Sequence, residues 1–180
     1  MTLDVTVGGS ASNSFATVAE ADAYMDSLTF RSAWPATGVA TGKEGALIQA
    51  ARMLDTLTWK GIRLSQAQAL SWPRMDGSNQ PHVLAPVGPV FGIFDRDGYE
   101  IPTDEIPKKI KNAQCELALR LITEDRNAQD VRQTVKEKVG PIEVEYATSA
   151  AQKVIPAVIF EYVSEFLAGG GGGRVGVQRA

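Results

Sequence analysis

The sequence predicts a mainly α-helical single domain, a four-helix bundle with a small β element and extended N- and C-terminal arms. Three observations lead to this prediction. Four segments carry apolar residues at helical spacing, and one short segment alternates around a Gly-Pro turn. A five-glycine run, Gly169 to Gly173, begins the last twelve residues and offers no side chains to pack. We therefore expect one domain over residues 1–168 and a flexible tail over residues 169–180.

The composition is that of an ordinary soluble globular domain. The chain has 180 residues, of which 44% are apolar and 22% charged. A chain of this size buries roughly 70% of the surface that it exposes when unfolded, so it needs no disulfide or metal to build a core. The 18 basic and 21 acidic side chains give a net charge of −3, and the pI is near 5.2. These values argue against a general polyanion binder, so any nucleic-acid contact must be local.

The counts of cysteine and histidine exclude several kinds of site. The chain has one cysteine, Cys115, and one histidine, His82. An intrachain disulfide framework, a multi-cysteine zinc site and a two-histidine metal pair are therefore excluded. We expect no enzyme activity, no cofactor and no metal. The sequence has no apolar run of about 20 residues, and Met1 to Ser14 do not resemble a signal peptide. We therefore expect a soluble chain that is not exported.

The N-terminal third carries two helix-start signals. Residues 3–7 alternate between apolar and polar side chains, which predicts a short strand-like arm. The capping boxes Thr17–Glu20 and Thr41–Glu44 predict helices over residues 17–28 and 41–57.

The remaining elements follow a long loop over residues 75–99. A third helix is predicted to begin at Pro107. Its apolar positions form two adjacent stripes, which indicates a helix that is either central in its own fold or shared with a neighbouring subunit. The stripes are Ile110, Ala113, Leu117 and Leu121, and Cys115, Ala118, Leu119 and Ile122. A hairpin over residues 131–146 turns at Gly140-Pro141, and a fourth helix begins at Pro156.

Isolated reactive side chains have simple structural interpretations. His82 has no nearby Ser, Cys or carboxylate in the sequence, so we expect a surface histidine. Cys115 lies on an apolar stripe, which favours a small buried side chain over a nucleophile. The acidic cluster over residues 95–105 lacks the ligand spacing of a calcium loop. Turn formation and helix-end charge account for this cluster more simply.

Aromatic side chains in the middle of the chain allow two interpretations. They could form a stacking platform for single-stranded nucleic acid, with neighbouring cations on the phosphates. Alternatively they fill a small core, which we favour because only 7% of the residues are aromatic. The aromatics are Trp59, Trp72, Phe94 and Tyr99, and the cations are Lys60, Arg63 and Arg74.

Four segments together resemble a known family. They are Gln68 to Arg74, Gly98 to Pro107, Ala113 to Ala118 and Lys138 to Tyr146, followed by the glycine-rich tail with its terminal arginines. In this order they resemble the head-tail connector (adaptor) proteins of tailed bacteriophages, and the resemblance runs from about Ser14 to the end of the chain. Sequences of this kind also carry the name DnaT-like single-stranded-DNA-binding protein.

The resemblance implies a connector-type helical adaptor without enzyme activity. Such a protein forms a ring, a dodecamer in this family, beneath the portal at the head-tail junction of the virion. It extends the channel through which the packaged double-stranded DNA passes, and it joins the portal protein to other neck or tail proteins. A single-stranded-DNA-binding replication accessory factor is the alternative.

Two sets of residues follow as site predictions from the adaptor interpretation. Glu137, Glu143 and Glu145 on the hairpin are expected to face the channel, where acidic groups prevent DNA from adhering. The tail is expected to dock on the portal, with the glycines as a linker. The predicted portal-binding residues are Leu167, Gly169, Gly170, Gly171, Gly172, Gly173, Arg174, Val175, Gly176, Val177, Gln178, Arg179 and Ala180.

Overall fold

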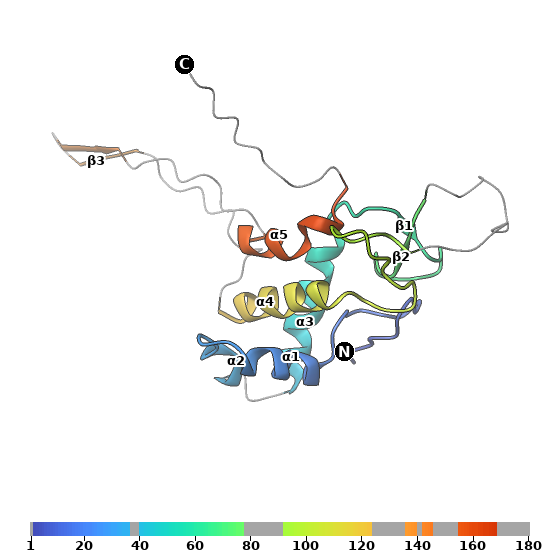
Figure 1. Ribbon diagram of the computed structural model, residues 1–180. Helices are drawn as coiled ribbons and strands as arrows, with labels where there is room; N and C mark the ends of the chain where they lie inside the picture. The colour runs from blue at the N-terminus through green and yellow to red at the C-terminus, as the bar shows by residue number, and fades with distance from the viewer. Residues whose placement is uncertain are drawn as a thin grey trace, which may run out of the picture.

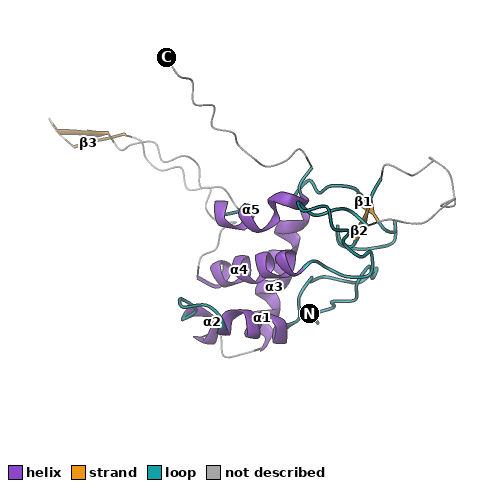
Figure 2. Cartoon of the chain, viewed as in Figure 1, coloured by secondary structure: helices purple, strands orange, loops and turns teal. Residues whose placement is uncertain are grey.

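Four longer helical segments and one short helix build the core of the protein. The computed structural model describes residues 2–36, 40–77, 92–123, 136–139, 142–145 and 155–168. Helices α1, α4 and α5 lie one above another in a layer, and α3 crosses behind them (Figures 1 and 2). The helices are α1 (Val18–Asp26), α2 (Ala33–Ala36), α3 (Ala40–Asp55), α4 (Lys108–Thr123) and α5 (Ala157–Val163), which continues into the 3-10 helix η1 (Ser164–Phe166).

Helix α4 is the centre of the fold. It packs against α3, α5, α1 and α2. Ile110, Ala113, Leu117 and Ala118 are fully buried, while Leu119, Leu121 and Ile122 pack at the margin of the core. The two apolar stripes are therefore explained within one molecule, because helices of the same chain cover both sides of α4.

One of the two predicted capping boxes is present. The Thr17 hydroxyl accepts a hydrogen bond from the Glu20 amide at 3.1 Å, and the Thr17 amide donates to Glu20 Oε2 at 2.8 Å. Helix α3 begins at Ala40, one residue before the predicted Thr41. The capping box at Thr41 itself stays a prediction.

The N-terminal arm folds onto itself and is not a strand. The Asp4 carbonyl accepts hydrogen bonds from the amides of Asn13 (2.9 Å) and Ser14 (3.1 Å). The Thr6 amide donates to the Asp4 carboxylate at 2.9 Å, and Leu3 packs against the core. The predicted strand-like arm over residues 3–7 is therefore wrong: its polar backbone groups are satisfied by a local loop instead of a ladder.

Helix α2 is an addition to the four predicted helices. Its Trp34 is buried, and the indole nitrogen donates to Asp22 Oδ1 at 2.6 Å. Helix α2 is a single helical turn between α1 and α3. A contact with α1 thus stabilises a turn that local sequence does not predict.

Two short antiparallel sheets complete the described structure. Strand β1 (Ile62–Arg63) pairs with β2 (Arg74–Met75), so that Arg63 lies directly opposite Arg74. The predicted hairpin is confirmed as β3 (Lys136–Val139) and β4 (Ile142–Glu145), with Val139 opposite Ile142. The Gly140-Pro141 turn and the tail over residues 169–180 lie outside the described residues.

Candidate nucleic-acid interface

The two central tryptophans form a buried aromatic cluster. Trp59 is 5% and Trp72 2% exposed. Their rings meet edge to face at 5.7 Å, and Trp72 meets Phe166 of η1 in the same way at 5.6 Å. The indoles are therefore core residues, and the stacking platform proposed for them from the sequence is wrong at these two positions. The favoured alternative, a small aromatic core, is confirmed for Trp59 and Trp72.

Arg74 stabilises the loop around this cluster through hydrogen bonds. Its guanidinium donates to the carbonyl oxygens of Lys60 (2.5 Å), Gly61 (2.6 Å) and Ser71 (3.0 Å). Burial lowers the pKa of Arg74, and the neighbouring positive charge of Arg63 lowers it further, while Asp55 acts in the opposite sense. Arg74 is thus a structural cation with few donors left for a ligand.

Arg63 is an exposed cation at this end of the molecule. Its side chain is exposed and has no hydrogen-bond or ion-pair partner within the described residues. Like charges directly opposite on paired strands repel each other. The Arg63–Arg74 pair therefore creates a local positive potential that an anion would relieve.

A tight turn presents two exposed aromatic rings. Phe94 is 47% and Tyr99 74% exposed. The Asp95 carboxylate accepts from the amides of Asp97 (2.9 Å) and Tyr99 (2.8 Å), and Gly98 has a φ of +87°. This turn chemistry is what we expected for the start of the acidic cluster. The hydrogen bonds to Asp95 fix the backbone between the two rings, and the side chains of Phe94 and Tyr99 stay exposed.

The turn is continuous with strands β1 and β2. Met75 forms a bridge with Gly92, and the Ile101 amide donates to the Ile93 carbonyl at 2.8 Å. Gly61, with a φ of +66°, lies so close that a Cβ atom there would be 2.3 Å from the Met75 carbonyl oxygen and 2.7 Å from Ile93. We use the name turn surface for the exposed side chains Arg63, Phe94 and Tyr99 of this region together with the half-buried Lys60.

Acidic groups limit the affinity that the turn surface can have for phosphate. Asp95, Asp97 and Glu100 belong to the same turn as the two rings. Asp95 is engaged by backbone amides as described, and Glu100 Oε1 accepts from the Gly92 amide at 2.6 Å. The carboxylates stay negatively charged and repel the phosphates of a nucleic acid. Binding at this surface therefore depends on ring stacking more than on phosphate contacts.

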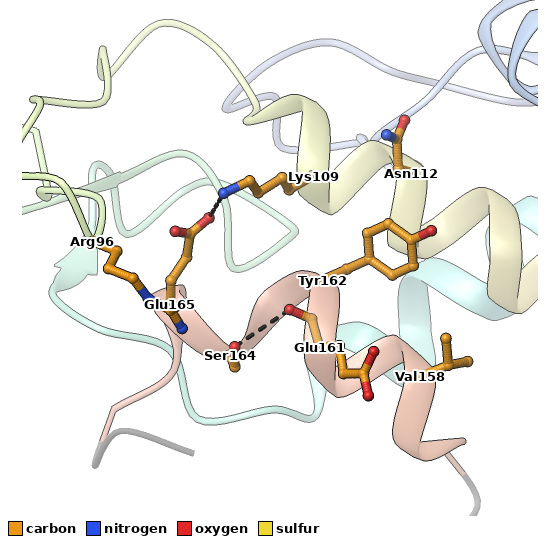
Figure 3. Close-up of a pocket in the computed structure, with 8 residues that line it drawn as sticks. All are labelled: Arg96, Lys109, Asn112, Val158, Glu161, Tyr162, Ser164 and Glu165. Carbon is orange, nitrogen blue, oxygen red and sulfur yellow. Dashed lines mark hydrogen bonds and ion pairs between the residues drawn. The ribbon is translucent and has the colours of Figure 1, made fainter. Parts of the chain in front are cut away.

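A separate pocket lies between α4 and α5 (Figure 3). Its volume is about 350 Å³, and it is lined by Arg96, Lys109, Asn112, Val158, Glu161, Tyr162, Ser164 and Glu165. Lys109 and Glu165 form an ion pair at 2.5 Å. Tyr162 shares a hydrogen bond of 3.2 Å with the hydroxyl of Tyr24 on α1. Burial raises the pKa of Tyr24, so this hydroxyl stays protonated.

Comparison with known proteins gives one family. The family model described as "Putative DnaT-like ssDNA binding protein" matches residues 1–86 and 89–180. The chain belongs to this family. No curated protein and no solved structure matches it.

The predicted portal-binding residues of this DnaT-like chain divide at Ala168. Leu167 is 9% exposed and bridges to Trp59, so it packs against the core, and its predicted portal contact stays a prediction. Its apolar side chain gains more from packing beside the tryptophan cluster than from exposure. The residues from Gly169 to Ala180 lie outside the described residues.

The three hairpin glutamates lie within the register of β3 and β4. Glu137 is paired with Val144, Glu143 with Lys138 and Glu145 with Lys136. Their channel-facing role stays a prediction.

The remaining candidate residues of the DnaT-like chain have structural roles or lie outside the described residues. Cys115 is buried, and burial raises the pKa of its thiol to about 12. The thiol is therefore protonated and unreactive, as we expected. His82 lies outside the described residues. In the part of the chain that the structure describes, no helix is long and apolar enough to cross a membrane, and no three metal-ligating side chains gather.

The sequence did not predict which of the four aromatic side chains are buried and which are exposed. It placed four aromatics and three cations in one group, whereas the structure buries the two tryptophans and leaves Phe94 and Tyr99 exposed. The sequence does contain a signal for the exposed pair, since Asp95-Arg96-Asp97-Gly98 is a turn sequence flanked by the two rings.

Proposed function

We propose that the protein binds single-stranded DNA through the turn surface. The observation that carries the proposal is the pair of exposed rings, Phe94 and Tyr99, on one turn that the Met75–Gly92 bridge joins to the strand pair of the exposed Arg63. The family to which the chain belongs is described by single-stranded-DNA binding, and this supports the proposal. Exposed bases can stack on such rings without regard to sequence.

The expected affinity is modest. Stacking contributes about 1–3 kcal/mol per base, so two rings supply roughly 2–6 kcal/mol. Lys60 and Arg63 allow about two phosphate contacts, which gives a slope of about −1.4 for log K against log salt on a single strand. Raising the salt concentration fourfold should then weaken binding about sevenfold.

The test is fluorescence anisotropy with a labelled 12-mer of thymidylate at 50 and 200 mM salt. We expect F94A and Y99A each to weaken binding at least about fivefold, because each removes one stacking surface. R63A should weaken binding and reduce the salt slope by about 0.7, because it removes one phosphate contact.

The matched control is F30A, which removes another exposed phenylalanine far from the turn along the chain. It should leave the affinity unchanged. A wild-type chain that does not bind the oligonucleotide at 50 mM salt, or one that binds equally well without Phe94 and Tyr99, contradicts the proposal.

A second candidate is the head-tail connector of a tailed phage, with the connector-type bundle and ring that the sequence resemblance implies. The end of the described core favours it. Leu167 is buried and the Ala168 amide donates to the Thr58 carbonyl at 2.9 Å, after which the sequence continues into five glycines, Arg174 and Arg179. A segment attached in this way suits a peptide that binds another protein.

The connector candidate is tested by mixing the chain with the portal ring of the same virion and measuring the mass of the complex. We expect a full ring of copies to add to the portal, and deletion of residues 169–180 to abolish the addition. Undiminished binding by the deleted chain contradicts a portal-binding tail. Absence of any complex contradicts the connector function as a whole.

A further inference from the structure

The described chain ends beside the turn surface. The Lys60 amide donates to the Phe166 carbonyl at 2.8 Å, and the Ala168 amide donates to the Thr58 carbonyl at 2.9 Å. Figure 1 shows the red end of the described chain on the same side of the helical layer as β1 and β2. Lys60 belongs to the turn surface, and Arg63 follows it by three residues. The residues after Ala168 therefore start close to the cations that we assign to phosphate contacts.

The sequence that follows Ala168 joins two cations to the core through a short linker. Residues 169–173 are glycines, and residues 174–180 carry Arg174 and Arg179 without an acidic side chain. These residues lie outside those that the structure describes, but their reach follows from covalent geometry. Five residues span at most about 18 Å. Groups joined to the core by such a linker have an effective concentration of about millimolar at the nearby surface.

The turn surface has an excess of negative charge that these cations offset. Its turn carries Asp95, Asp97 and Glu100 against the single arginine Arg96. The carboxylates repel phosphates and attract arginines. Arg74, on the strand pair beside the turn, is engaged by three carbonyl oxygens. The phosphates of a strand stacked on the rings therefore meet more acidic than basic groups at the turn.

We propose that Arg174 and Arg179 bind the phosphates of the single strand whose bases stack on Phe94 and Tyr99. The inference rests on the proposed function of the turn surface and adds a second group of contacts to it. Glycine-rich segments that carry arginines bind single strands without sequence preference, because their positive charges follow the backbone. The planar guanidinium group donates two parallel hydrogen bonds to a phosphate. Positive charge between the acidic turn and the strand also weakens the repulsion between them.

The proposal changes the expected salt dependence of binding. The slope of about −1.4 expected for the turn surface counts the contacts of Lys60 and Arg63 alone. With two further phosphate contacts, the slope of log K against log salt for the full chain becomes about −2.8. Raising the salt concentration from 50 to 200 mM should then weaken binding about 50-fold, compared with about sevenfold for the turn surface by itself.

The experiment is the anisotropy titration of the full chain with the labelled 12-mer of thymidylate at 50, 100 and 200 mM salt. We expect the double variant R174A/R179A to have a slope of about −1.4, and deletion of residues 169–180 to have the same effect. R174K/R179K keeps both charges and should keep a slope of about −2.8. V175A/V177A is the matched control, because it shortens two side chains of the same segment without removing a charge. It should bind like the wild type.

The slope separates this inference from the proposed function. A wild-type slope of about −1.4, or an unchanged slope in R174A/R179A, overturns the tail contacts and leaves the turn surface as the site. A wild-type chain that does not bind the 12-mer at 50 mM salt contradicts the proposed function and the tail contacts together. F94A should lower the affinity at every salt concentration without changing the slope, because it removes a stacking surface and no charge. All tail variants lie beyond Ala168, so they alter none of the described residues.

Discussion

Gln114 joins three segments of the core through one side-chain amide. Its Oε1 accepts from the Phe15 amide at 3.0 Å, and its Nε2 donates to Ser14 Oγ at 2.7 Å and to the Leu47 carbonyl at 2.8 Å. The side chain is fully buried. A buried polar group is favourable only when its hydrogen bonds are made, and here all three partners are also buried or in the backbone.

We therefore expect Gln114→Ala to be strongly destabilising. The Phe15 amide loses its acceptor while it stays out of water, and a cavity remains at the centre of α4. The free energy of unfolding should fall by about 2–4 kcal/mol. Urea denaturation monitored by tryptophan fluorescence measures this change. Gln66→Ala, at an exposed position, should alter it by less than about 0.5 kcal/mol.

Cys115 gives a prediction about alkaline pH. Burial raises the pKa of its thiol from about 9 to about 12, so between these values the unfolded chain loses a proton that the folded chain keeps. The folded state then binds more protons than the unfolded state, and stability falls as the pH rises through this window. The loss is up to about 1.4 kcal/mol per pH unit for a single group.

Thermal unfolding of the wild type and C115A at pH 8, 9 and 10 measures this effect. The difference in stability between the two should narrow as the pH rises above 9, because the variant has no thiol to titrate. Tyr24 also has a raised pKa in both proteins, mainly through burial and only least through Cys115, so the comparison removes most of its effect. A constant difference across the three pH values would contradict the assignment to Cys115.

At the scale of an element, the first turn of α1 depends on a reciprocal pair. Thr17 and Glu20 each accept a hydrogen bond from the backbone of the other, and Glu20 also pairs with Lys111 of α4 at 2.6 Å. The first turn of α1 is thereby stabilised by its own capping box and by an ion pair with the central helix α4. Lys111 and the two Thr17 contacts lower the pKa of Glu20 by more than its partial burial raises it.

Thr17→Ala should destabilise the protein by about 1 kcal/mol, because the Glu20 amide loses its acceptor. Thr29→Ala is a suitable control, since Thr29 is exposed and lies outside the helices. Differential scanning calorimetry of the two variants measures the difference. Equal melting temperatures would mean that the capping box contributes nothing to stability.

The elements that the sequence predicts well are those whose signals are local. The Thr17 box, the stripes of α4 and the alternation within β3 and β4 each depend on residues close together in the chain. Other features depend on residues distant in the sequence. They are the loop of the N-terminal arm at residues 3–7, the helical turn at Trp34 and the pairing of Arg63 with Arg74. For the same reason the sequence grouped Trp59 and Trp72 with Phe94 and Tyr99: burial is decided by tertiary packing against η1.

At the scale of the whole molecule, several cations of the described residues are already engaged. Lys43, Lys109, Lys111 and Arg120 are paired with acidic groups, and Arg74 is engaged by carbonyl oxygens. With a net charge of −3, long-range attraction to a polyanion is absent. Function at the turn surface, in the pocket or on another protein must therefore arise from short-range contacts.

The end of the core gives a final prediction about where the domain stops. Leu167 packs beside Trp59, and the Ala168 amide is bonded to Thr58, whereas the sequence that follows is a run of glycines without side chains to bury. Deleting residues 169–180 should therefore leave the melting temperature within about 2 °C of the wild type. Deleting residues 167–180 also removes the buried Leu167, which should cost about 2–5 kcal/mol and lower the melting temperature markedly. Calorimetry of both truncations, with L167A as the point variant, measures the contrast. Equal destabilisation by the two deletions would mean that stabilising contacts continue past Ala168. A loss of partner binding after deletion of the tail could then result from unfolding, and it would no longer show that the tail binds the partner.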